Sequence, residues 1–229
     1  RRHTARLSMT ERKKGIVALV ALSFVFATMG IYARYLQTDF ALLQQIYLRL
    51  FGAALLGTAL FWGGISFKKI KSISSKDWGV IIFRALSFAV GVTLFTLAFL
   101  TTKYSDATFV AAIPLLPLLG YVFLKEKVPM VTLLYVLLGF VCVAVIAIHD
   151  FSHMFSWGSG ELYAFLSAVA LDFSYVGRRM QSTLLNDRES PVLIFFIEAL
   201  LVFAASFYFG ESFPSASAFT FGSVVVRVI

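Results

Sequence analysis

Seven long apolar runs, each about as long as a membrane-spanning helix, limit what this sequence can fold into. A helix that crosses a bilayer needs about 20 apolar residues, far more than a strand of a membrane barrel. The runs cover residues 15–36, 42–66, 79–102, 107–124, 130–149, 160–179 and 192–210, and an eighth begins near Phe219. The sequence therefore predicts an all-α polytopic membrane protein.

The composition excludes several other classes of protein. Only 14% of the 229 residues are charged and 59% are hydrophobic, with a mean hydropathy of +0.86. A soluble domain carries about 25% charged residues, so this chain has too few charges to cover a water-facing surface. The net charge of +8 does not indicate a nucleic-acid partner, because the basic residues stand in short clusters between the apolar runs. A disulfide scaffold is excluded because Cys142 is the single cysteine.

The basic clusters also predict an orientation. Fifteen of the twenty lysines and arginines lie before the first run, in the second and fourth connections, or at the end of the sixth run and in the connection that follows it. Cytoplasmic connections of membrane proteins carry such an excess. We therefore expect residues 1–14 to form a basic cytoplasmic segment, in a multi-pass protein of the plasma (bacterial inner) membrane.

An internal repeat relates the two parts of the chain. A shift of 145 residues places Gly15 on Gly160 and Arg34 on Arg179, and residues 79–84 (GVIIFR) match residues 222–227 (GSVVVR). The first run then corresponds to the sixth and the third to the eighth, so the period is five runs. Because five is odd, the second copy enters the membrane from the other side, as in many secondary transporters.

The sequence thus predicts an inverted repeat of five transmembrane helices. The first copy covers residues 15–149 and a partial second copy covers residues 160–229. The eighth run stops at Ile229 without a polar tail. We therefore expect a fragment whose second repeat lacks its C-terminal helices.

Several motifs resemble the EamA-like family of the drug/metabolite transporter superfamily. They are the stretches 94–109 (LFTLAFLTTKYSDATF), 113–117 (IPLLP), 123–127 (FLKEK) and 160–168 (GELYAFLSA), together with Arg49 in the stretch 47–50 (YLRL). The resemblance covers nearly the whole chain from Gly15. It implies ten spans in two inverted repeats and the export or exchange of small metabolites.

Charged and proline residues inside the runs are the candidate functional residues. A charge inside the hydrocarbon costs about 2.5–3.5 kcal/mol on insertion scales, so it needs a reason. The charged candidates, which lie away from the ends of the complete runs, are Arg49, Arg84, Asp172 and Glu198, together with Arg227 in the eighth run.

Arg49 either lines a substrate cavity or makes a structural contact between helices, and Gln45 lies on its face. Asp172 and Glu198 lie at similar depths, so adjacent helices would bring them close enough to share a proton. The alternative is that each carboxylate meets an arginine separately.

Prolines in the fourth run predict a bent helix beside a substrate path. The substrate-binding candidates are Arg49, Gln45, Tyr175, Pro114 and Pro117, and the proton-coupling candidates are Asp172 and Glu198. His149 and His153 are four residues apart but lack further ligands, so we expect neither a metal nor another cofactor.

The sequence predicts a secondary transporter of small organic metabolites that works by alternating access, and not an enzyme, since no nucleotide-binding or hydrolase motif is present. Its expected partners are a small-molecule substrate and the lipid bilayer. The sequence is also compatible with a homodimer. The alternative function is a non-transporting membrane scaffold.

Overall fold

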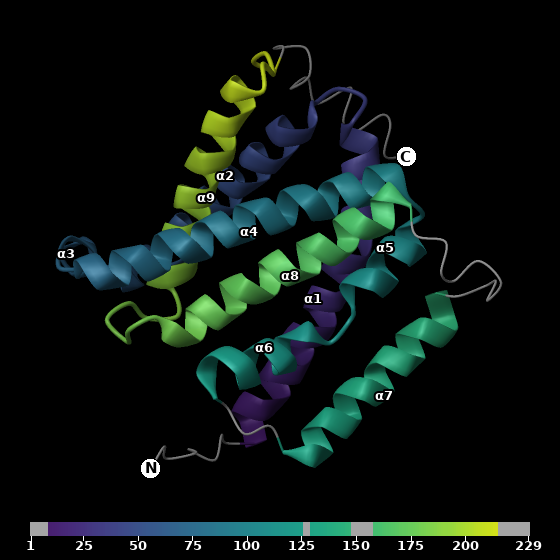
Figure 1. Cartoon of the computed structure of the whole chain (residues 1–229). Helices are drawn as coiled ribbons and strands as arrows, with labels where there is room; N and C mark the ends of the chain where they lie inside the picture. The colour runs from purple at the N-terminus through teal and green to yellow at the C-terminus, as the bar shows by residue number, and fades with distance from the viewer. Residues whose placement is uncertain (1–8, 126–128, 148–157, 215–229) are drawn as a thin grey trace.

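The computed structural model describes residues 9–125, 129–147 and 158–214, and within these ranges the chain forms helices and no β-strand (Figure 1). The elements are α1 (Met9–Leu36), α2 (Leu42–Leu60), a 3-10 turn η1 (Trp62–Gly64), α3 (Phe67–Lys71), α4 (Ser75–Thr101), α5 (Tyr104–Ala111), α6 (Leu115–Leu124), α7 (Met130–Ala147), α8 (Ser159–Met180) and α9 (Glu189–Tyr208). The eighth apolar run, the repeat match at residues 222–227 and both histidines of the 149–153 pair lie outside the described residues.

Four stretches of helix are long and apolar enough to cross a membrane. They are Lys13–Leu36 in α1, the whole of α4, the α5–α6 stretch Tyr104–Leu124, and α9. This confirms the prediction of a helical protein with several candidate membrane spans. Helices α2 and α8 are not among these stretches, because Gln44 and Arg49 in α2 and Asp172 in α8 lower their mean hydropathy. In α7, the apolar stretch Met130–Cys142 is shorter than the four candidate spans. Their crossing of the membrane stays a prediction.

The fourth apolar run is not one continuous helix. Helix α5 ends at Ala111 and α6 begins at Leu115, with Pro114 between them at φ −78° and ψ 67°. Pro117 lies in the first turn of α6, where a missing backbone N–H breaks no intrahelical bond. The predicted bend is therefore present, and it is a complete interruption of the helix.

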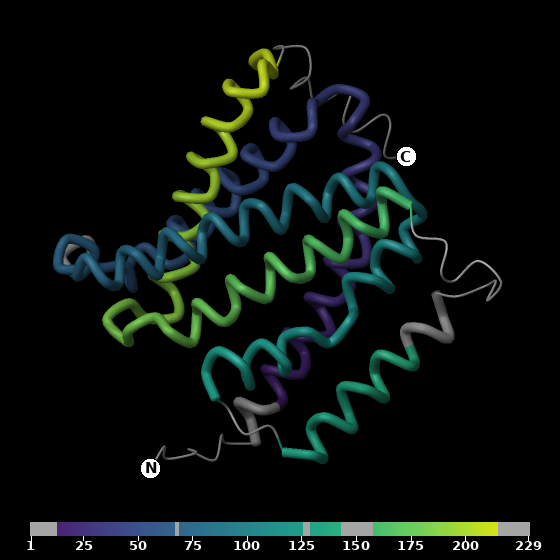
Figure 2. Tube along the Cα trace, in the orientation of Figure 1, coloured from purple at the N-terminus to yellow at the C-terminus, as the bar shows by residue number. Residues whose placement is uncertain are grey.

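Helices α4 and α8 run side by side through the middle of the molecule, and small residues let them approach closely (Figure 2). A Cβ atom on Gly91 of α4 would lie 2.7 Å from Leu171 Cγ of α8, and one on Gly177 of α8 would lie 2.5 Å from Arg84 Cγ. The hydroxyl of Ser167 donates to the Gly91 carbonyl at 2.9 Å. Close backbone approach through small residues is the usual way that helices associate in a bilayer.

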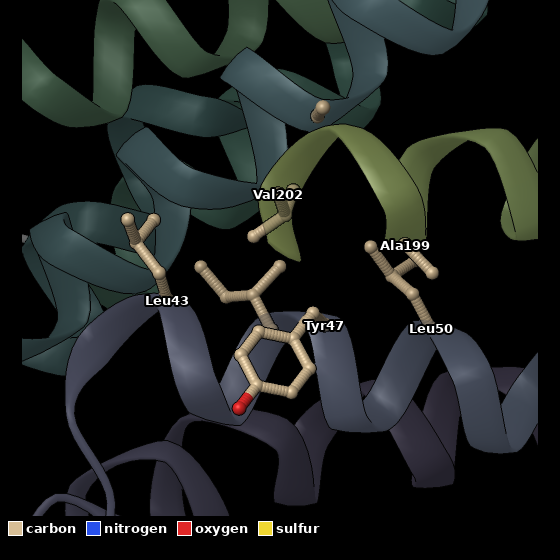
Figure 3. Close-up of a cluster of buried hydrophobic side chains, with 7 residues drawn as sticks. Leu43, Tyr47, Leu50, Ala199 and Val202 are labelled. Carbon is tan, nitrogen blue, oxygen red and sulfur yellow. The ribbon is translucent and has the colours of Figure 1, made fainter. Parts of the chain in front are cut away.

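Helices α2 and α9 form a second close pair, packed on the other side of α4 from α8 (Figure 1). In Figure 3, Leu43, Tyr47 and Leu50 of α2 face Ala199 and Val202 of α9. The Tyr47 ring meets the Phe203 ring edge-on, with centroids 5.2 Å apart. Aromatic and branched side chains thus join two helices that lie about 150 residues apart in sequence.

Hydrogen bonds join the connections into two groups at opposite ends of the α2–α9 pair. At one end, Glu189 Oε1 accepts from the Ser66 N–H at 2.9 Å and Asn186 Nδ2 donates to the Gly64 carbonyl at 3.2 Å. At the other end, Glu211 accepts from the Leu43 and Gln44 N–H groups at 3.0 and 3.1 Å. We call the first the basic end, because its connections contain lysines and arginines.

The contacts at the two ends fit the predicted alternation of the connections. The second and sixth connections, both basic in sequence, meet at the basic end, and Lys69 there pairs with Glu189. The start of α2, directly after the first connection, meets the residues after α9 at the other end. Which end faces the cytoplasm stays a prediction.

Candidate functional site

Arg49 lies between α2 and α4 and makes two hydrogen bonds. Its Nε donates to the Gln45 carbonyl one turn earlier at 3.2 Å, and its Nη2 donates to the Thr96 hydroxyl of α4 at 3.2 Å. No described carboxylate lies within ion-pair distance of it. Arg49 therefore makes the contact between helices that one reading of the sequence expected, and its positive charge is left without a negative partner there.

Gln45 accompanies Arg49 on the same face of α2. Its side chain is only 1% exposed, and its Nε2 donates to the Phe40 carbonyl at 3.3 Å. Its Oε1 is buried without a hydrogen-bond partner. Arg49 thus joins this face of α2 to α4, and the side-chain oxygen of Gln45 is an acceptor that no described donor uses.

A second polar group surrounds Arg84 of α4. Arg84 Nη1 donates to Gln181 Oε1, at the end of α8, and to the Ser190 hydroxyl of α9 at 3.1 Å. The Ser190 hydroxyl also bonds Gln181 Oε1 at 3.1 Å. These three residues tie α4, α8 and α9 together near the basic end.

Glu198 lies on α9 next to this group and is completely buried. Arg84 is the charged group that acts on it, but neither of its carboxyl oxygens has a hydrogen-bond partner. Glu198 thus lies near an arginine without a hydrogen bond to it, and its role, as a proton-coupling residue or as the partner of an arginine, stays a prediction.

Asp172 and Tyr175 lie one turn apart on α8. Tyr175 is 50% exposed, and Asp172 is partly buried without a described hydrogen bond. Helix α4 lies between α8 and α9, as Figure 1 shows, and no described hydrogen bond joins Asp172 to Glu198. The described residues therefore show no contact between the two carboxylates, and a shared proton between them stays a prediction.

The interruption at Pro114 lies beside α8 and not beside Arg49. Helix α6 packs on α8, where the Phe123 and Phe173 rings meet edge-on with centroids 5.5 Å apart. The seven candidate residues are thus distributed over three places: the α2–α4 contact, the Arg84 group, and α8 with the α5–α6 break. Among the described residues they do not form one cluster.

Sequence reasoning missed the two glutamates that join α2 to α9. Glu189 is 1% exposed and accepts from the N–H groups of Ser66 and Asn186, and Asn186 Oδ1 accepts from the Glu189 N–H at 2.8 Å. This reciprocal pair resembles a capping box, so an Asn three residues before a Glu, ahead of an apolar run, was the available signal. Nothing local in the sequence marks Glu211 as a partner of α2.

Within the described ranges, no group of three or more metal-ligating side chains comes together. Comparison of the chain with known protein families, curated proteins and solved structures finds no match. The sequence and the geometry above therefore carry the functional proposal.

Proposed function

We propose that this protein is a secondary transporter that exports or exchanges small organic metabolites by alternating access, as the EamA-like resemblance implies. One observation carries the proposal: two arginines and a glutamate lie inside the helical bundle where α4 meets α2 and α9. Charges inside a membrane bundle are costly, and they are typical of substrate and ion pathways.

Arg49 is the residue that we propose binds substrate. Its guanidinium has five N–H donors and uses two of them in the described bonds, to neutral oxygens. A planar guanidinium binds a carboxylate or phosphate through two parallel bonds. The proposed substrate is therefore a small metabolite with an anionic group, which would supply the missing negative partner.

The pairing of α2 with α9 supports an inverted repeat in this proposal. With a period of five runs, the second run corresponds to the seventh, which makes α2 and α9 equivalent. The end contacts make them antiparallel, since Glu211 after α9 caps the start of α2 and Glu189 at the start of α9 meets the residues after α2. Equivalent elements that pack antiparallel on each other fit a two-fold axis in the membrane plane.

The test is a transport screen in proteoliposomes. The purified protein would be reconstituted and offered panels of radiolabelled metabolites with and without a carboxylate or phosphate group, in uptake and in counterflow. We expect saturable transport of an anionic metabolite that Arg49→Gln abolishes. Binding of other membrane proteins, without transport of any metabolite in the panels, would favour the scaffold function instead.

A further inference from the structure

Glu198 is in a position where an ionised carboxylate is strongly unfavourable. It lies nine residues into α9, at a depth of roughly 14 Å from Glu189 at about 1.5 Å per residue. Its side chain is 0% exposed, and both oxygens lack a hydrogen-bond donor. A charged carboxylate needs such donors when it is removed from water.

Arg84, the neighbouring cation, is occupied elsewhere. Its Nη1 bonds the neutral oxygens of Gln181 and Ser190, while its Nε is buried without a partner. The Nε2 group of Gln181 is also buried without a partner. The Nε–H of Arg84 is therefore an unused donor near Glu198, whose carboxyl oxygens lack a donor.

The surroundings of Glu198 favour a proton as its ligand over a metal ion. The charged groups on the helices packed against α9 are Arg49 of α2 and Lys76, Asp77 and Arg84 of α4, and of these Arg84 acts on Glu198. A positive guanidinium repels a metal cation, and the described residues form no group of three or more metal-ligating side chains here.

We propose that Glu198 is the site of a coupled proton, and that Arg84 becomes its partner when the proton leaves; the coupling rests on the proposed transport function. In the state described, Glu198 is a neutral carboxylic acid. On release, its O–H bond breaks and the proton passes to water. The carboxylate then accepts hydrogen bonds from the Arg84 guanidinium, which gives up Ser190 and Gln181.

The polar residues Arg84, Ser190 and Gln181 place the proton site on the side of the bundle that leads to the basic end. Gln181 directly follows α8 and is only partly buried, so it joins Arg84 to the connection at the basic end, of which it is the first residue. Exchange of Arg84 from Ser190 to Glu198 would also alter the contact between α4 and α9. Protonation is thereby linked to the position of α9 against α4, which is what coupling requires.

Infrared spectroscopy of the protein in lipid nanodiscs tests the proton directly. At neutral pH the protein should show a protonated-carboxyl C=O band that is lost in Glu198→Gln and kept in the matched variant Asp172→Asn. An identical spectrum for Glu198→Gln and the unmodified protein would overturn the inference. If Glu198→Gln does not fold, Glu198→Asp keeps the acid and should shift the band, and an unshifted band would overturn it equally.

The role of Arg84 is tested by titrating the same band. Arg84→Gln removes the positive charge that favours the carboxylate, so Glu198 should lose its proton only at a proton concentration at least tenfold lower than in the unmodified protein. Arg84→Lys keeps the charge and should titrate closer to the unmodified protein. An unchanged titration in Arg84→Gln would exclude Arg84 as the partner.

The outcomes for coupling and for transport are separate. A Glu198 band in a protein that transports no metabolite would contradict the transport proposal and leave the proton site. Metabolite transport by a protein without that band would contradict the proton site alone.

Discussion

At the scale of single residues, the polar side chains inside this bundle fall into two kinds. Glu189 is buried but fully engaged, with backbone N–H donors and Lys69 around its carboxylate. Glu198 is buried and has no hydrogen bond, and Arg49 is bonded to neutral oxygens alone. The first kind stabilises the fold, and the second kind retains binding capacity that a ligand, a proton or a moving partner can use.

Arg49 can be assigned to one of these kinds by measuring stability and transport together. If it binds substrate, Arg49→Gln should leave the melting temperature nearly unchanged and abolish transport, and Arg49→Lys should recover transport only in part, because an ammonium lacks the planar fork. Thr96→Val is the matched control, since it removes the acceptor on α4 and leaves Arg49 in place. A loss of stability in proportion to the loss of transport, in both variants, would make Arg49 a structural residue.

Glu189 should behave as a structural residue. Glu189→Gln removes a charge that accepts from Ser66 and Asn186, and we expect a loss of about 1.5–3 kcal/mol of stability, the range for hydrogen bonds to a charged group. The control is the neighbouring Asp187→Asn, whose carboxylate is 93% exposed in its pair with Arg178 and should leave the melting temperature unchanged. Equal melting temperatures for the two variants would contradict this assignment.

At the scale of elements, the contact between α4 and α8 depends on the absence of side chains. Gly91 is the sharpest case, because a Cβ there would meet both the Leu171 side chain and, at 3.1 Å, the Leu171 backbone nitrogen. A backbone atom cannot move aside as a flexible side chain can. The two helices would have to separate.

Gly91→Ala should therefore destabilise the protein by about 1–3 kcal/mol, as overpacked cores generally do. Gly79→Ala, in the same helix, is the matched control, since nothing lies within 4 Å of the added Cβ. Thermal unfolding in detergent compares the two. If Gly79→Ala lowered the melting temperature as much as Gly91→Ala, close packing at Gly91 would not be the cause.

The helices themselves could largely be predicted from the sequence, whereas their packing against one another could not. Hydropathy locates the long helices within a few residues, and Pro114 predicts the break between α5 and α6, because both signals are local. The pairing of α4 with α8 is not local, because Gly91 meets Ser167 and Gly177 meets Arg84 across about 80–90 residues of chain. The distance between Asp172 and Glu198 likewise depends on α4 lying between their helices, which depth along a helix cannot reveal.

At the scale of the whole molecule, the two groups of connections imply a testable topology. The basic end should face the cytoplasm. In a background with Cys142→Ser, a thiol reagent added outside intact cells should label Gln37→Cys and not Lys71→Cys, both at exposed positions. Permeabilised cells control for reactivity, because both cysteines should then be labelled. Labelling of Lys71→Cys in intact cells would reverse the orientation.

The distance along the chain between Arg84 and its partners has a consequence for synthesis. Arg84 and Ser190 are 106 residues apart. At roughly 5–20 residues per second, the ribosome makes Ser190 about 5–20 s after Arg84. During that interval α4 holds a cation in or near the bilayer before its partners on α8 and α9 are complete, so water, lipid head groups or the insertion machinery must accommodate it. The order of translation thus leaves Arg84 without Gln181 and Ser190 until the whole of α8 and the first residues of α9 have been made.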